Sequence, residues 1–350
     1  MSDAIPSRRV LVPLALTPAA PCPVDSAIVT LDGETMGTTW SVRIVAPAHA
    51  ERAQWTDTLR QELERELAVV IRQMSQWEPE SDISRFNHAP AGSWHGIPRE
   101  FRTVLTCALD LSRQTGGAYD PTYGDLVDLW GFGPSGRHRQ EPAQAEIERR
   151  SGRAGWTRLE QRSFDGSIRQ PGGLHLDFSS VAKGFAVDQL SRLLTRLGLF
   201  HHLVEIGGEL RGSGHKADGT PWWVRLDPAR QPQAGGAVSS APAATETLLA
   251  LHGLSVATSG DERNFVADGR VHCHTLDPRT GCPVQNDISS VAVIHESCMM
   301  ADALATALMV LGSMAGLEYA VRNDVAALFR VKTASGIREI GSPAFELMAE

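Results

Sequence analysis

One apolar run, residues 299–311, carries a single carboxylate and a single hydroxyl at a helical spacing. Asp302 and Thr306 are four residues apart, so the predicted helix places both on one face. Polar groups in apolar surroundings cost free energy unless something satisfies them, and these two oxygen ligands suit a hard cation such as Mg²⁺. A simpler interpretation stays open at this point. Asp302 can cap the helix, and Thr306 can bond back to the carbonyl one turn earlier.

The size and charge of the chain narrow the class of protein. It has 350 residues, of which 42% are hydrophobic and 21% are charged, as in a soluble protein with one large domain or two modest ones. A formal net charge of -8 argues against nucleic acid or an anionic membrane surface as the main partner. The five cysteines are scattered and contain no C-x-x-C pair, which favours reduced thiols over a disulfide framework.

The first 26 residues are expected to form a flexible segment. Arg8-Arg9 and the apolar residues after them imitate a signal peptide, but Asp3 precedes the arginines and Pro13 interrupts the apolar run. No apolar stretch is expected to reach the length of a membrane span. We therefore predict a cytoplasmic protein without a transmembrane segment.

Strands and helices alternate irregularly over the rest of the chain, which predicts a single α+β domain, with mixed sheets and packed helices, at residues 27–346. Expected strands lie at 27–45 (two strands), 174–178, 203–206, 222–226, 254–258, 271–276, 289–294 and 325–329. Expected helices lie at 55–74, 98–115, 181–197 and in the apolar run, and residues 126–133 are expected to be a loop. Residues 231–245 are rich in Ala, Gly, Pro and Ser, which predicts a mobile insertion.

Residues 177–184 have a pattern that suits a phosphate. Asp177 stands near the end of a predicted strand, a helix start follows at Ser179-Ser180, and Lys183 falls on the first turn. Exposed backbone amides and a lysine at a helix N-terminus favour an anionic ligand. The other interpretation is a capped helix with a surface lysine. The residue order is not that of a Walker loop.

Two further patterns are less specific. Gly207-Gly208 follow a predicted strand, but their spacing does not match a dinucleotide-binding loop, so a turn or a close backbone approach to a ligand is preferred. His272 and His274 share one face of a predicted strand and have cysteines nearby, although the spacing matches no common zinc site. We favour the interpretation that His274 lines a polar pocket, beside the rigid turn at 277–281.

Taken in order, eight segments of the chain resemble the ApbE-type FAD:protein FMN transferases. Together the matches extend over roughly Asp32 to Gly312, and eight collinear matches make chance agreement implausible. The resemblance implies the T-fold-like α+β architecture of that family. The matching segments are residues 34–40, 75–87, 119–122 with 129–133, 176–188, 205–209, 257–261, 274–281 and 301–306.

The resemblance also implies a reaction and a site. Such enzymes split the pyrophosphate of FAD, join FMN through a phosphoester to a Thr or Ser of a target flavoprotein, and release AMP. By resemblance, Mg²⁺ belongs at Asp302 and Thr306, with a main-chain oxygen at Ser180, and His274 is the expected proton acceptor for the incoming hydroxyl. The resemblance therefore implies that Asp302 and His274 are the catalytic residues. The implied FAD contacts are Met36, Trp77, Ala118, Tyr119, Asp120, Asp177, Lys183 and Leu276.

Two other functions fit the same residues. In a Mg²⁺-dependent FAD pyrophosphatase, water replaces the acceptor hydroxyl and the products are FMN and AMP. In a flavin-binding protein without turnover, a poised metal site and base would have no use, so the combination of Asp302, Thr306 and His274 argues against it. The chain departs from the family in two places. Many members are exported lipoproteins, whereas the start of this chain lacks a convincing signal. The resemblance also assigns no role to residues 231–245.

Overall fold

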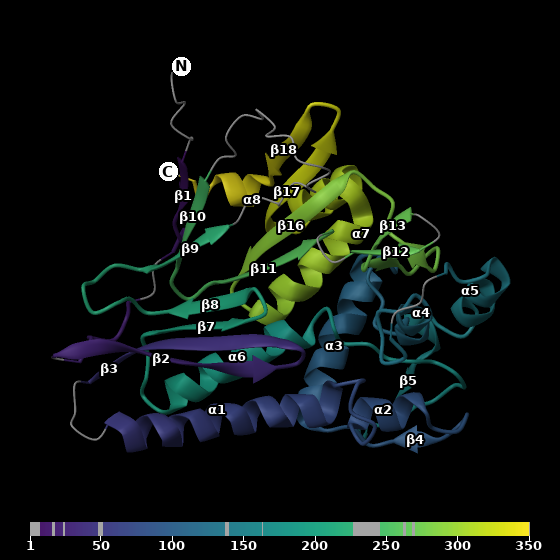
Figure 1. The fold of residues 1–350 in the computed structure, drawn as a ribbon, viewed down its shortest axis with the longest axis horizontal. Helices are drawn as coiled ribbons and strands as arrows, with labels where there is room; N and C mark the ends of the chain where they lie inside the picture. The colour runs from purple at the N-terminus through teal and green to yellow at the C-terminus, as the bar shows by residue number, and fades with distance from the viewer. Residues whose placement is uncertain are drawn as a thin grey trace.

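The computed structural model describes residues 8–15, 18–23, 25–47, 52–136, 140–162, 164–226, 246–261, 264–267 and 270–349. The insertion predicted at 231–245 lies outside these residues. In the described part, the fold is α+β as predicted, built around a sheet of eight strands with antiparallel neighbours (Figure 1). In spatial order its strands are β18 (Gly336–Gly341), β17 (Ala326–Thr333), β16 (Ile288–His295), β11 (Ser255–Gly260), β8 (Glu209–Ser213), β7 (His202–Ile206), β3 (Thr38–Pro47) and β2 (Ser26–Thr35).

Three long helices, α1 (Arg52–Met74), α6 (Ala182–Arg196) and α7 (Cys298–Arg322), lie on one face of this sheet. α7 packs on β11 and β16, α6 packs on β7, β8 and α7, and α1 packs on α6 (Figure 1). The side chains between these layers form the main core, where Trp40, Phe178 and Leu308 are almost completely buried. This core fixes the positions of α6 and α7, the two helices that carry most of the predicted metal and phosphate ligands.

By length and composition α7 could cross a membrane, and its most apolar window has a mean hydropathy of 1.6. The expectation that no apolar stretch has this length is therefore wrong. Within the fold, 61% of that window is buried, against α6 and the strands β11 and β16. Packing on several sides explains why the run is apolar around most of its circumference.

A second, smaller sheet packs against the other face of the large sheet, and the side chains of both sheets form a second core. In it β1 (Arg8–Leu11) pairs in parallel with β10 (Glu246–Leu251), and β10 pairs antiparallel with β9 (Trp222–Leu226). The short helix α8 (Pro343–Glu346) packs beside this second core. The expectation of a flexible segment through residue 26 is wrong for β1, because its backbone is paired with β10 and Leu11 is fully buried.

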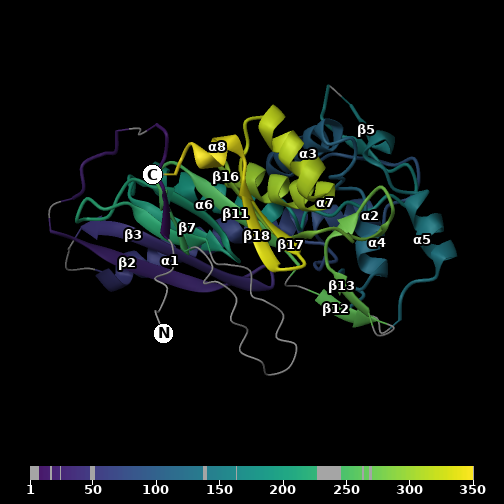
Figure 2. The ribbon, with the colours of Figure 1, turned by 90° about the horizontal axis from the view of Figure 1, so that it is seen from above.

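The remaining elements surround one end of α7 (Figure 2). The longest of them, α3 (Arg99–Gln114), packs directly on α7 and on α1, and the others are short segments before and after it in the chain. These elements are α2 (Asp82–Asn87), β4 (Trp94–His95), α3 (Arg99–Gln114), α4 (Gly124–Leu129), α5 (Gln144–Ser151), the 3-10 turn η1 (Trp156–Arg158), β5 (Glu160–Gln161), β6 (Ile168–Arg169), β12 (Asn264–Ala267), β13 (Arg270–Cys273), β14 (Leu276–Asp277) and β15 (Cys282–Pro283).

The chain at residues 174–178 is extended but is not a strand, contrary to the prediction. The Asn87 side chain takes the place of a neighbouring strand, since its Nδ2 donates to the Leu176 carbonyl at 2.9 Å and its Oδ1 accepts from the Leu176 amide at 2.7 Å. Buried residues alternate along this segment, but its backbone bonds to the Asn87 side chain at Leu176 and to the turn at residues 121–124 at His175 and Asp177. The strand predicted at 271–276 is divided between β13 and β14, and part of the loop predicted at 126–133 belongs to α4.

Candidate active site

One cavity of about 1230 Å³ lies between α7, the start of α6 and the interior strands β7, β8 and β11 of the large sheet. It brings together 11 of the 12 site residues proposed above, although they come from distant parts of the sequence. Met36 is the exception. It occupies the β2–β3 turn with a φ of 49° and packs against the main core. The lining residues are Trp77, Ala118, Tyr119, Asp120, Asp177, Ser180, Lys183, His274, Leu276, Asp302 and Thr306.

Asp302 lies in the second turn of α7 and is only 4% exposed. Its Oδ2 accepts a hydrogen bond from the Gly184 amide at 3.0 Å, and its Oδ1 is 3.9 Å from Lys183 Nζ. Burial raises the pKa of Asp302, whereas Lys183 and the Gly184 amide favour the charged carboxylate. The capping interpretation fails, because Ser297 is the N-cap of α7 and accepts from the Met300 amide.

Thr306 lies one turn after Asp302 and also faces the cavity. Its Oγ1 is 3.0 Å from Ser259 Oγ near the end of β11, so the two hydroxyls share a hydrogen bond. The pair Asp302 and Thr306 therefore presents a carboxylate and a hydroxyl to the same space, as their spacing predicted. Ser259 is a neighbour that the sequence interpretation did not single out.

The approach of α6 to α7 depends on Gly184. A Cβ at this position would lie 2.3 Å from the Cys298 carbonyl oxygen and 2.8 Å from Asp302 Cβ, so no larger residue fits without separating the helices. Asp188, one turn further along α6, accepts from the amides of Cys298 and Met299 at 3.1 and 3.2 Å. These contacts fix the N-terminal end of α7 against α6.

Ser180 precedes α6 and faces the cavity. Its Oγ donates to the Tyr119 hydroxyl at 3.0 Å, which orients the side chain away from its own backbone. The Gly184 amide, which in a continuous helix would donate to the Ser180 carbonyl, donates to Asp302 instead. A main-chain oxygen at Ser180 is thus positioned close to the helix start that also holds Asp302.

Glu209 is a buried carboxylate that the sequence interpretation included in a motif but did not propose as a site residue. It is 3% exposed and contacts Lys183 Nζ through Oε1. Its Oε2 is buried and has no hydrogen-bond partner among the described residues. Burial and then the charge of Asp302 raise the pKa of Glu209 to about 7, while Lys183 opposes this rise. Lys183 thus lies between two acidic groups in a poorly solvated place.

The turn at Gly207-Gly208 explains how Glu209 reaches this position. Both glycines have positive φ, and they connect β7 to β8 with Ile206 paired to Glu209. Two-residue turns of this kind match the twist of the two strands and require such φ values. The preferred interpretation as a turn is confirmed, and the dinucleotide-binding alternative fails because a strand follows instead of a helix.

Two other acidic residues of the cavity are held by backbone amides. Asp120 accepts from the Thr122 amide and hydroxyl with one oxygen and from the Trp156 amide at 2.9 Å with the other. Asp177 accepts from the Ser179 amide at 2.7 Å. Burial raises the pKa of both Asp120 and Asp177, and these hydrogen bonds oppose the rise. Asp120 therefore shapes the loop beside Tyr119 as well as lining the cavity.

Three further site residues, Trp77, Leu276 and His274, line other parts of the cavity. Trp77 is 54% exposed, which leaves its ring surface accessible, and Leu276 is buried. The His274 ring is half-buried and meets the edge of Phe132 at a centroid distance of 6.2 Å. The turn after His274 is fixed by Asp277, which pairs with Arg279 at 2.8 Å.

The zinc interpretation of the His272 region is not supported among the described residues. His272 Nε2 is 3.0 Å from Glu141 Oε1, and neither histidine belongs to a group of metal-ligating side chains there. His274 faces the cavity instead, as the alternative interpretation expected.

The chain was compared with known proteins. The sequence pattern of the ApbE family matches residues 36–329. An FAD:protein FMN transferase of Vibrio cholerae is 36% identical over 97% of this chain and 98% of its own length, and one of Haemophilus influenzae is 33% identical over 98% of each. The crystal structure of the flavinyl transferase ApbE of Pseudomonas stutzeri, in the apo form, superimposes with a TM-score of 0.82 at 36% identity, covering 92% of this chain and 97% of that one.

Proposed function

Because this chain belongs to the ApbE family and is a transferase, we propose that it moves FMN from FAD to a Thr or Ser of a target flavoprotein in a Mg²⁺-dependent reaction that releases AMP. The observation that carries this proposal is the group formed by buried Asp302 and half-buried Thr306 and Lys183 in the wall of a large cavity. Two oxygen ligands and a cation in one place suit a pyrophosphate and its metal.

The residues fit Mg²⁺ by the chemistry of their donor atoms. Asp302 offers a buried carboxylate, Thr306 a hydroxyl one turn later, and Ser180 a main-chain oxygen beside the same helix start. Oxygen ligands of this kind are what Mg²⁺ prefers, and the described residues that line the cavity include no Cys or Met that would favour a softer metal. A bound Mg²⁺ would supply positive charge next to the phosphates.

The side chains of this protein would bind and orient FAD around that centre. Lys183 would exchange its contact with Glu209 for a phosphate oxygen, since its Nζ already lies in the cavity wall. Trp77 offers an accessible ring on which the flavin or the adenine can pack, and Tyr119 lies on the same cavity wall. Asp302 and Glu209 beside Lys183 are buried, and the low local polarity strengthens charge interactions at that end of the cavity.

His274 is the proposed proton acceptor for the incoming hydroxyl. Its ring faces the cavity and is held at one edge by Phe132, and the turn that follows it is rigid. When the acceptor hydroxyl forms the new bond to phosphorus, the bond from phosphorus to the AMP oxygen breaks and the hydroxyl proton passes to His274. AMP leaves with the electron pair of the broken bond.

An incubation with purified FAD and Mg²⁺, with and without an acceptor flavoprotein, tests the proposal. We expect AMP to appear only with the acceptor, together with an acceptor that is heavier by the mass of bound FMN. Release of AMP and free FMN without the acceptor would identify a pyrophosphatase instead. No AMP under either condition would identify a protein that binds flavin without turnover.

A further inference from the structure

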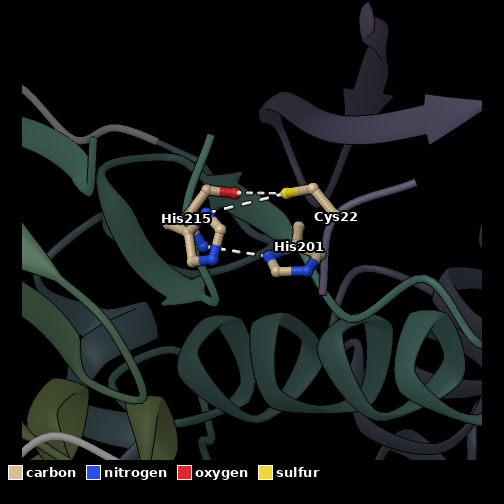
Figure 3. A group of neighbouring side chains, drawn as sticks. All are labelled: Cys22, His201 and His215. Carbon is tan, nitrogen blue, oxygen red and sulfur yellow. Dashed lines mark hydrogen bonds between the residues drawn. The ribbon is translucent and has the colours of Figure 1, made fainter. Parts of the chain in front are cut away.

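A second group of metal-ligating side chains lies outside the catalytic cavity. Cys22, in the segment that follows β1, meets His201 and His215 at the open end of the β7–β8 hairpin (Figure 3). None of the three lines the cavity. Glu209 stands at the other end of β8, so the length of a five-residue strand, about 17 Å at 3.4 Å per residue, separates the two places.

The ligand atoms of these side chains lie close enough for one metal ion. One ligand atom from each residue lies within 4.8 Å of the other two. Cys22 Sγ is 3.6 Å from His215 Nδ1, and the two imidazole rings are 4.6 Å apart between centroids. In a tetrahedral zinc site, bonds of about 2.3 Å to sulfur and about 2.0 Å to nitrogen place sulfur and nitrogen about 3.5 Å apart. The Cys22 and His215 pair already has this separation.

The side chains of this group also offer ligand atoms that suit such an ion. His201 is 3% exposed, and its Nε2 is buried, with the backbone of Ala20 and Pro21 close to the ring. An imidazole nitrogen and a thiolate sulfur are both ordinary ligands of zinc. When a cation binds, the Cys22 thiol would give up its proton to solvent and coordinate as the thiolate.

Without a metal, these three side chains make few polar contacts, and those of the Cys22 thiol are long. The His215 amide donates to His201 Nδ1 at 3.1 Å, and His215 Nδ1 is 2.9 Å from the Lys216 carbonyl. The Cys22 thiol reaches the carbonyls of His215 and Lys216 only at 4.0 and 3.8 Å. Neutral hydrogen bonds of this kind are much weaker than thiolate and imidazole bonds to a transition metal, so coordination can replace them.

We propose that Cys22, His201 and His215 bind one transition-metal ion of the Zn²⁺ class, with a fourth position left for water or another ligand. One thiolate with two imidazoles favours such a cation, and the absence of carboxylates from this group disfavours Mg²⁺. The ion would connect the segment at 18–23 to the β7–β8 hairpin, which are far apart in the sequence but adjacent in the fold. This site is independent of the proposed transfer reaction.

Titration of the full-length, tag-free protein with Co²⁺ tests the site, because a cobalt–thiolate bond absorbs in the near ultraviolet. We expect this charge-transfer band to reach its maximum at one equivalent, and Zn²⁺ to abolish it. Cys22→Ser should lose the band. Cys273→Ser is the matched control and should keep it, since Cys273 lies beside His272 and His274 in sequence but in no such group among the described residues.

A second variant and a second measurement distinguish loss of the metal site from misfolding of the variant. His215→Gln should weaken Co²⁺ binding at least tenfold while Asp302→Asn, in the other site, leaves the band unchanged. Zn²⁺ should raise the melting temperature of the wild type but not that of Cys22→Ser. Absence of the band from the wild type, or an equal band in Cys22→Ser, would overturn the proposal.

Discussion

The backbone amide of Gly184 donates to Asp302 Oδ2 at 3.0 Å, so the first turn of α6 holds the carboxylate of α7 in place. This contact joins two segments that the sequence analysis identified independently. They are the phosphate pattern at residues 177–184 and the apolar run at residues 299–311, which contains Asp302. The contact also places Lys183, the residue before Gly184, 3.9 Å from the other oxygen of Asp302. The geometry of the candidate site thus rests on how closely the two helices approach.

Gly184→Ala should separate these helices. Its Cβ would lie 2.3 Å from the Cys298 carbonyl, and overpacking of this kind costs about 1–3 kcal/mol of unfolding free energy. We also expect FMN transfer to fall, because Asp302 moves with α7. Gly96→Ala is the control, since an added Cβ there meets nothing within 4 Å. Equal stability of the two variants in urea unfolding would contradict this account of the crossing.

Trp77→Ala should weaken FAD binding without affecting the fold. Trp77 is 54% exposed at the cavity, so its removal leaves little empty space in the core. Loss of an aromatic stacking contact costs about 0.5–1.5 kcal/mol, which corresponds to a rise in KM for FAD of about 2- to 12-fold. Steady-state kinetics measure it, and Phe164→Ala, exposed and outside the cavity, should keep the wild-type KM. An unchanged KM in Trp77→Ala would show that this ring does not contact FAD.

His274→Ala should slow transfer about 10²- to 10⁴-fold while FAD still binds, because a positioned base contributes a factor of this size. Added imidazole should restore part of the rate. His88→Ala is the control, since His88 bonds to the Ser84 carbonyl and does not line the cavity. Wild-type transfer by His274→Ala with FAD bound would remove the proposed proton acceptor.

His295 should make the protein less stable in mild acid. Burial is the main cause that lowers the pKa of His295 from 6.5, and its Nδ1 accepts a hydrogen bond from the Ser297 amide at 2.9 Å. The unfolded chain therefore takes up a proton before the folded one does. The stability from this residue is complete above pH 6.5 and is lost as the pH falls below that value. Protonation also removes the acceptor beside Ser297, the N-cap of α7.

Urea unfolding of the wild type and of His295→Gln between pH 5 and 7.5 measures this effect. The wild type should lose more unfolding free energy on acidification than the variant does. Parallel curves for the two proteins would show that His295 does not titrate differently in the folded and unfolded chains.

Much of the fold follows from local patterns. The helical pattern of residues 55–74 and 181–197 predicted α1 and α6, and the strands expected at 203–206 and 222–226 correspond to β7 and β9. The spacing of Asp302 and Thr306 was enough to place both on one face of α7, because helical geometry alone decides this. Each of these features depends only on residues that are close to one another in the sequence.

Other features depend on partners that are distant in sequence. β1 pairs with β10 across 238 residues, and Asn87 satisfies the backbone of Leu176, so neither segment contains its own signal. Glu209 becomes part of the cavity only because a two-residue turn folds β8 back toward Lys183. The Cys22 group joins residues 193 positions apart, and no local spacing could have indicated it.

Mass spectrometry of a target flavoprotein co-expressed with this chain tests the central claim most directly. With the wild type, a Thr or Ser of the target should carry an adduct of the mass of FMN. With Asp302→Asn, which can still accept from the Gly184 amide but has lost its charge, the adduct should fall by at least about 10²-fold. An undiminished adduct with folded Asp302→Asn, or none with the wild type, would contradict the account.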